Sequence, residues 1–145
     1  MLRKQALDAV LRVARLREQQ AAAVAQRERQ QLNDAIAAAN QLDQFANEYR
    51  KDLSQALESD RGRAPDLVRL LEFARKLEST AQDQRQASQP LKLRAAESME
   101  KYYALRLKLD GLEKLELQMK SRLRQELSLR ESRETEDAIA SRLGH

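Results

Sequence analysis

Apolar residues recur along this chain in alternating steps of four and three residues, beginning at Leu7 and continuing over most of its length. Steps of this kind, the heptad repeat, place a narrow apolar stripe along an α-helix, as in coiled coils, and not the broad apolar face of a globular helix. In the first series, 13 of 15 positions are apolar or aromatic. The series consists of Leu7, Leu11, Ala14, Glu18, Ala21, Ala25, Glu28, Leu32, Ala35, Ala39, Leu42, Ala46, Tyr49, Leu53 and Ala56.

A second series with the same steps begins at Leu67, and 13 of its 18 positions are apolar or aromatic. The series consists of Leu67, Leu70, Ala74, Leu77, Ala81, Gln84, Ser88, Leu91, Ala95, Ser98, Tyr102, Leu105, Leu109, Leu112, Glu116, Met119, Leu123 and Glu126. We call the two series together the seam. The pattern predicts two long helices that bury their seams against each other.

The only marked break between the two series is the segment 59–65, which contains Gly62 and Pro65. Glycine readily adopts the left-handed conformation that ends helices, and a proline shortly afterwards cannot continue one. Because so short a connection makes two helices fold back on each other, the sequence predicts an all-α fold, a long antiparallel two-helix coiled-coil hairpin. Within a single elongated domain, residues 1–145, the expected bounds are about 2–58 for the first helix, about 59–65 for the turn and about 66–140 for the second helix.

If the chain reverses in the middle of the turn, the numbers of facing residues add up to about 124. This rule pairs Glu18, a charged residue in the seam, with Arg106. It leaves residues 124–145 without a partner, so we expect an unpaired C-terminal helical overhang. Pro90 removes an amide donor inside the second series, which predicts a kink or local unwinding near residues 86–90.

The residue inventory argues against an enzyme. The chain has no cysteine, and its one histidine, His145, is the last residue of the sequence. There is no glycine-rich loop that could cradle a phosphate and no cluster of side chains at metal-ligand spacing. We therefore expect no catalysis, no cofactor, no metal site and no small-molecule substrate. The first twenty residues lack the apolar core of a secretory signal, and no apolar run approaches the ~20 residues of a membrane span.

The formal net charge is +4, and residues 1–30 contribute seven arginines and lysines against three acidic residues. A solvated, slightly basic helix face is one interpretation of this excess. A patch that meets an acidic protein or a nucleic acid is the other. Because the chain has neither a long basic block nor a zinc or RNA-binding motif, nucleic acid is not an expected partner.

Three of the five aromatic residues, Phe45, Tyr49 and Phe73, fall in one short section of the predicted hairpin. Tyr49 occupies a seam position, whereas Phe45 and Phe73 lie beside the seam. The pattern fits two interpretations at this point. The aromatic rings either pack along the flank of the coiled coil or form an exposed apolar patch for protein docking.

The segment Leu42–Arg50, with the sequence LDQFANEYR, follows a long stretch rich in alanine, glutamine and arginine. It resembles the L-x-x-[YF]-x-x-E-Y-R signature of the flagellar export protein family FliJ. In that family a second helix opens with an aromatic residue and a leucine four positions later, as Phe73 and Leu77 do here. The two-helix layout and the length of 145 residues agree with the same family.

The resemblance implies a non-enzymatic component of the bacterial flagellar type III export apparatus, cytoplasmic and peripheral at the inner membrane of the flagellar base. FliJ-like proteins act as a stalk in the centre of the hexameric export ATPase, and they bind the cytoplasmic domain of the export gate and export chaperones. These three are the implied partners, and any membrane association runs through them. The two ends of the chain are expected to contact the ATPase ring.

The resemblance also implies a gate-binding patch. By position it comprises Leu42, Phe45, Tyr49, Phe73 and Leu77, with Thr80 and Gln84 as a weaker continuation. Two alternatives remain from the sequence. The chain is either the stalk of a virulence-type secretion ATPase, which shares the two-helix layout, or a structural coiled-coil scaffold that assembles through its outer faces.

Overall fold

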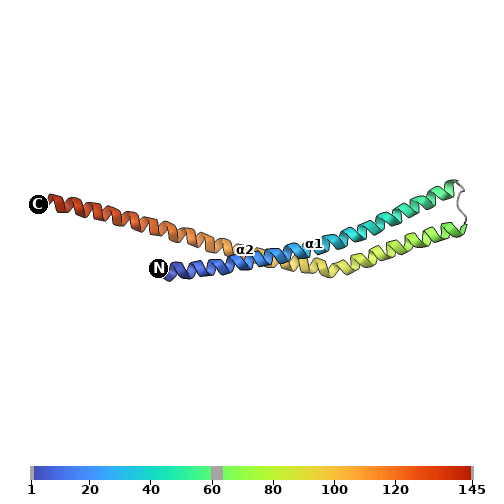
Figure 1. Cartoon of the computed structure of the whole chain (residues 1–145), viewed down its shortest axis with the longest axis horizontal. Helices are drawn as coiled ribbons and strands as arrows, with labels where there is room; N and C mark the ends of the chain where they lie inside the picture. Colours follow the sequence, from blue (N-terminus) through green and yellow to red (C-terminus); the bar gives the residue numbers. More distant parts are fainter. Residues whose placement is uncertain (1, 60–63, 145) are drawn as a thin grey trace. The chain divides into compact units, whose positions relative to one another are not determined.

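The computed structural model describes residues 2–59 and 64–144 and contains two helices, α1 (Leu2–Ser59) and α2 (Ala64–Leu143) (Figure 1). The all-α prediction is confirmed. The helix ends expected near 58, 66 and 140 differ from the observed ends by one, two and three residues. The middle of the expected turn, 60–63, lies outside the described residues.

The residues on either side of that segment suit helix ends. Pro65 lies in the first turn of α2, where its missing N–H group costs no intrahelical hydrogen bond. Asp66 in the same turn brings a negative charge to the positive end of the helix dipole. At the end of α1, the hydroxyl of Ser59 donates a hydrogen bond of 2.7 Å to the carbonyl of Gln55. Local chemistry thus favours the end of α1 and the start of α2 at these positions.

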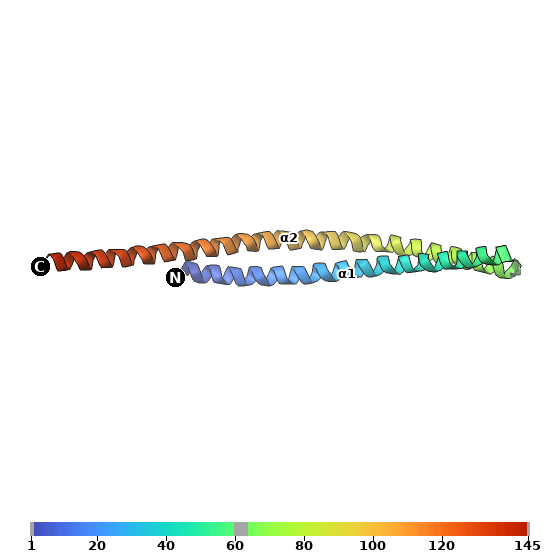
Figure 2. The ribbon, with the colours of Figure 1, turned by 90° about the horizontal axis from the view of Figure 1, so that it is seen from above.

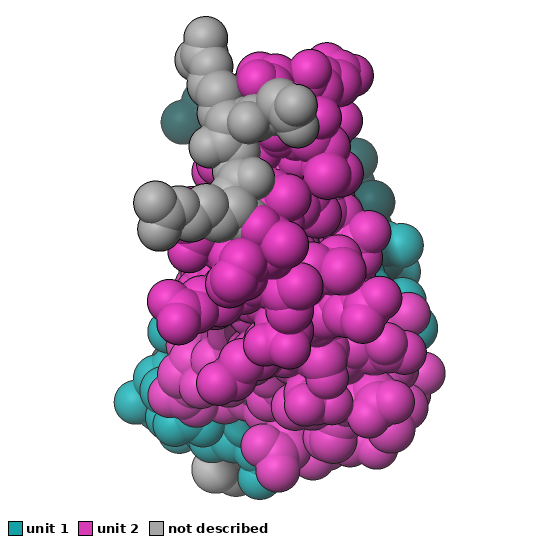
Figure 3. Space-filling model, turned by 90° about the vertical axis from the view of Figure 1, so that its right-hand side faces the viewer, with its two compact units in different colours: residues 1–20, 103–145 teal, residues 21–102 magenta. Residues whose placement is uncertain are grey.

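The chain divides into two compact units, each built from a part of α1 and a part of α2 and coloured separately in Figure 3. Unit 1 consists of Met1–Gln20 and Tyr103–His145, and unit 2 is Ala21–Tyr102. Within unit 2 the helices run side by side in opposite directions, as both Figure 1 and Figure 2 show. Contacts between the rings of Tyr49 and Phe73 connect them. The predicted hairpin of two packed helices is confirmed.

Polar contacts between the helices follow the predicted pairing. In unit 1 a guanidinium nitrogen of Arg106 lies 3.9 Å from a carboxylate oxygen of Glu18, the pair expected from the sequence. In unit 2 the hydroxyl of Ser98 donates a hydrogen bond to the carboxylate of Glu28, which is also a seam residue. A charged residue in the seam of α1 therefore has a polar partner on α2 in each unit, which lowers the cost of placing it there.

The buried residues of the described chain all belong to the seam. They are Leu11, Ala25, Ala39, Ala46, Ala74, Ala81, Ser88, Ser98 and Leu109. Every other seam position from Leu7 to Met119 is half-buried. Five of the nine buried residues are alanines, because a two-helix pair covers a methyl group completely but leaves one side of a longer side chain open. The heptad pattern therefore locates the core correctly.

The last part of α2 differs from the rest of the seam. Every described residue from Ser121 to Gly144 is exposed, including the two final seam positions, Leu123 and Glu126. The helix nevertheless continues to Leu143. A partner on α1 would bury one face of this segment, and these residues have no buried face. The unpaired overhang itself stays a prediction.

Helix α2 passes through Pro90 without interruption, so the segment 86–90 is helical and the predicted local unwinding is not observed. Proline removes the hydrogen bond to the carbonyl four residues earlier but its ring still permits helical dihedral angles. Just before it, the hydroxyl of the buried Ser88 donates 2.6 Å to the carbonyl of Arg85. A bend at Pro90 stays a prediction.

Candidate protein-docking groove

The five main residues of the predicted patch come from facing parts of α1 and α2 within unit 2. Leu42, Phe45 and Tyr49 are three and four residues apart on α1, and Phe73 and Leu77 are four apart on α2. Such spacings place each set on one side of its helix. Tyr49 is half-buried in the seam, whereas the side chains of Phe45 and Phe73 remain 41% and 46% exposed.

These side chains form an open groove beside the seam. The rings of Tyr49 and Phe73 meet edge to face with centroids 4.9 Å apart and an interplanar angle of 78°. This arrangement brings the positive edge of one ring to the negative face of the other. The groove has a volume of about 410 Å³ and is lined by Phe45, Glu48, Tyr49, Asp52, Phe73 and Leu77. We call it the aromatic groove.

Three residues of the predicted patch lie outside the lining of the aromatic groove. Leu42 and Gln84 are half-buried seam residues. Thr80 is exposed, and its hydroxyl donates a hydrogen bond of 2.8 Å to the carbonyl of Lys76. The structure thus brings four of the seven predicted residues together around one groove.

The signature residues Glu48, Tyr49 and Arg50 have three different environments. Arg50 forms a two-point ion pair with Glu78 of α2, with nitrogen–oxygen distances of 2.7 and 2.8 Å. Tyr49 packs against Phe73. Glu48 lines the groove. Two signature residues therefore hold α1 against α2, and the third faces solvent at the groove.

Another cross-helix ion pair lies near the groove. The guanidinium of Arg85 contacts the carboxylate of Asp43 and also donates a hydrogen bond of 3.3 Å to the side-chain carbonyl of Asn40. Together with the pair formed by Arg50 and Glu78, it gives this section of unit 2 two charged contacts between helices. Exposed ion pairs of this kind add little stability individually.

Sequence reasoning missed the two carboxylates of the groove, Glu48 and Asp52. Their spacing from Phe45, three and seven residues, was the available signal, because those steps follow one face of a helix. Both side chains are exposed. Neither has a hydrogen bond or ion pair with another described residue.

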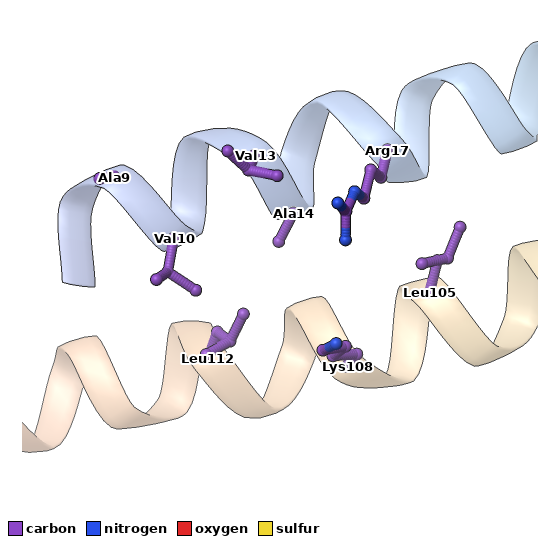
Figure 4. Close-up of a pocket in the computed structure, with 8 residues that line it drawn as sticks. All are labelled: Ala9, Val10, Val13, Ala14, Arg17, Leu105, Lys108 and Leu112. Carbon is purple, nitrogen blue, oxygen red and sulfur yellow. The ribbon is translucent and has the colours of Figure 1, made fainter. Parts of the chain in front are cut away.

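A second groove lies in unit 1, between the amino-terminal part of α1 and the middle of α2. It has a volume of about 350 Å³ and is lined by Ala9, Val10, Val13, Ala14, Arg17, Leu105, Lys108 and Leu112. Figure 4 shows Val10 of α1 and Leu112 of α2 pointing toward each other across the groove. Val10 and Val13 are each 48% exposed. We call it the valine groove.

The valine groove carries positive charge at its rim. Arg17 and Lys108 line it, and neither has an ion pair with another described residue. The neighbouring Arg106, in contrast, contacts both Glu18 and Asp110, at 3.9 and 3.1 Å. The aromatic groove and the valine groove therefore both combine apolar side chains with a charged rim, acidic in the first and basic in the second.

The residues that line the two grooves include no histidine, cysteine or serine. No group of three or more potential metal-ligating side chains occurs among the residues that the structure describes. Within the same residues, none of the helices has an apolar stretch long enough to cross a lipid bilayer. Apolar side chains with a charged rim are instead typical of surfaces that bind other proteins.

Comparison with known families gives a match over nearly the whole chain. The family model described as "Flagellar FliJ protein" matches residues 3–145. A search of curated proteins and a search of solved structures each returned no match. The matched region includes all of unit 2, unit 1 from residue 3 onward, both grooves and the exposed end of α2.

Proposed function

The chain belongs to the flagellar FliJ family, whose members are non-enzymatic structural components of the flagellar export apparatus, and we propose that it acts there as a helical stalk that couples the export ATPase ring to the export gate. The observation that supports this proposal most directly is the aromatic groove of unit 2. A stalk needs a lateral surface for one partner and a separate surface for the other. We assign one of these surfaces to each unit.

The gate contact is assigned to the patch of Leu42, Phe45, Tyr49, Phe73 and Leu77, continued by Thr80 and Gln84. Large aromatic side chains that stay exposed on a polar helix pair are costly in water and release free energy when a partner covers them. Phe45 and Phe73 meet that description, each with more than two fifths of its surface exposed. Binding free energy at protein interfaces is concentrated on such anchors.

The ATPase contact is assigned to unit 1, which contains both the start of α1 and the end of α2. The exposed helix from Ser121 to Gly144 offers a surface that α1 does not cover. In a ring of six subunits, a single helix of this kind reaches a narrower opening than a helix pair does. The proposed coupling is mechanical and allosteric, with no reaction on the chain itself.

Export chaperones are proposed as the third class of partner, and the cytoplasmic face of the inner membrane at the flagellar base as the place of action. Membrane proximity comes from the gate and the ATPase, since no described helix could span a bilayer. The exposed leucines of unit 2 outside the groove, such as Leu57 and Leu93, are available for chaperone contacts.

The test of the gate contact is the double substitution Phe45→Ala and Tyr49→Ala, measured by titration against the soluble cytoplasmic domain of the export gate. We expect binding to weaken by about tenfold or more, because truncation of one hot-spot anchor commonly costs about 2 kcal/mol. Helix content by circular dichroism should change little, since most seam residues are kept.

The matched control is Leu57→Ala with Leu93→Ala, which removes two apolar side chains of unit 2 that are 62% and 66% exposed and lie outside the aromatic groove. This control should bind the gate domain as the parent chain does. Equal affinity of the Phe45/Tyr49 variant and the parent chain would refute the assignment of the patch.

A further inference from the structure

We propose that the aromatic groove takes a positively charged segment of its partner, with an apolar anchor on the groove floor and lysine or arginine side chains held by Glu48 and Asp52. The inference rests on the proposed gate contact and adds the chemistry of the partner segment. It makes Glu48 and Asp52 determinants of specificity, a role separate from that of the aromatic residues.

The floor of the groove selects the apolar part of this segment. Phe45, Tyr49, Phe73 and Leu77 surround a space of about 410 Å³, within the size range of pockets that bind compact ligands and single anchor side chains. The edge-to-face contact of Tyr49 and Phe73 fixes one wall. An aliphatic or aromatic side chain is the occupant that such walls favour.

The rim selects the charge. Glu48 and Asp52 are four residues apart on α1, which places both carboxylates on the same side of the helix, one turn apart. Both line the groove. The nearby carboxylates Asp43 and Glu78 are neutralised by arginines of the facing helix.

Neither Glu48 nor Asp52 forms an ion pair with an arginine or lysine among the described residues, although unit 2 contains other basic residues. Two unneutralised negative charges beside an apolar surface repel an acidic segment and attract a basic one. Arginine suits the site best, because its planar guanidinium binds carboxylates at two points and stacks on aromatic rings.

The decisive variant is Glu48→Gln with Asp52→Asn, which keeps the shape of the rim and removes its charge. In titrations of the full chain with the soluble gate domain at low salt, we expect binding to weaken by about three- to tenfold. The difference from the parent chain should shrink at high salt, because screening removes the same attraction from the parent. Charge reversal, Glu48→Lys with Asp52→Lys, should weaken binding further.

The control for net charge is Glu97→Gln with Glu100→Gln, two exposed residues of unit 2 outside the groove. It should bind the gate domain as the parent chain does. If the Glu48/Asp52 variant binds equally well at low salt while the Phe45/Tyr49 variant is weakened, the charge inference is wrong and the gate contact stands. If neither variant changes the affinity, the gate contact itself is wrong.

A second probe does not depend on the gate. A short helical peptide of leucines and lysines, and its counterpart with glutamate in place of lysine, are titrated into the isotope-labelled full chain. The lysine peptide should shift the amide resonances of residues 45–52 and 73–77, and the glutamate peptide should not. Equal shifts with both peptides, or a dimer of the chain that the Phe45/Tyr49 substitutions abolish, would overturn the proposal.

Discussion

At the scale of single residues, alanine in the seam determines how closely the helices approach. Ala46 and Ala74 are completely buried, although each contributes only a methyl group. Small residues permit a short distance between helix backbones, and nearby Tyr49 contacts the ring of Phe73 on the opposite helix. The alanines thus serve the geometry of the aromatic groove as well as the packing of the hairpin.

Replacement of Ala46 by leucine should destabilise the hairpin. The added side chain has no space in the seam and must push the helices apart, which typically costs about 1–3 kcal/mol. Urea unfolding followed by circular dichroism measures the effect. Ala37→Leu is the matched control, because Ala37 is exposed and the same substitution there should be nearly neutral. Equal stability of the Ala46 and Ala37 variants would contradict the tight packing described for this part of the seam.

Residue-scale contacts were predictable from the sequence only where they lie in the seam. The pair of Glu18 and Arg106 was predicted, because a charged residue in the seam faces the opposite helix and forms its ion pair there. The pair of Arg50 and Glu78 was not, since both residues lie beside the seam, where side-chain length and rotamer choose among several partners. For the same reason, the sequence did not predict that Glu48 lines the aromatic groove.

At the scale of the helices, Pro90 marks the place where α2 lacks one backbone hydrogen bond. The helix continues through it, so the cost is borne by the packing of α2 against α1. The seam near Pro90 is also polar, with Ser88 and Gln84 in positions that leucine or alanine fills in most other parts of the seam. Both features weaken the same stretch of the helix pair.

Replacement of Pro90 by alanine should therefore stabilise the chain, by about 1–3 kcal/mol, since alanine restores the donor and has the highest helix propensity. Thermal unfolding and amide hydrogen exchange of residues 84–94 measure the gain, and exchange in this stretch should slow down. Pro65→Ala is the matched control. Because Pro65 lies in the first turn of α2, its replacement should change stability little. A similar gain at both positions would show that the position of Pro90 within α2 is not the cause.

At the scale of the whole chain, the sequence predicted the fold well because a two-helix pair has the simplest of cores. Burial along one stripe of each helix determines it, and a heptad repeat encodes such a stripe directly. The grooves were harder to predict. They depend on which side of the seam each flanking residue faces, as Val10 and Lys108 illustrate in unit 1. The charge of each groove depends on which charged side chains form ion pairs with the facing helix. The heptad repeat does not specify those ion pairs.

Removal of the residues after Arg124 tests the role proposed for the exposed end of α2. Residues 125–144, the part of the deleted segment that the structure describes, are all exposed, so the midpoint of thermal unfolding should change little. Stimulation of the export ATPase should fall strongly, whereas affinity for the gate domain should match that of the parent chain. Full ATPase stimulation by the shortened chain would exclude this segment from the ATPase contact. A loss of gate affinity would instead show that the two surfaces are coupled.

Among the described residues, those that are buried all lie in the seam, which has a consequence for how such a chain evolves. Substitutions elsewhere leave folding almost untouched, so selection can rewrite the outer faces one position at a time. A new recognition preference, such as another charge beside the rings at Phe45 and Phe73, needs no compensating change in the interior. The binding specificity of the chain can therefore change in evolution while its fold stays the same.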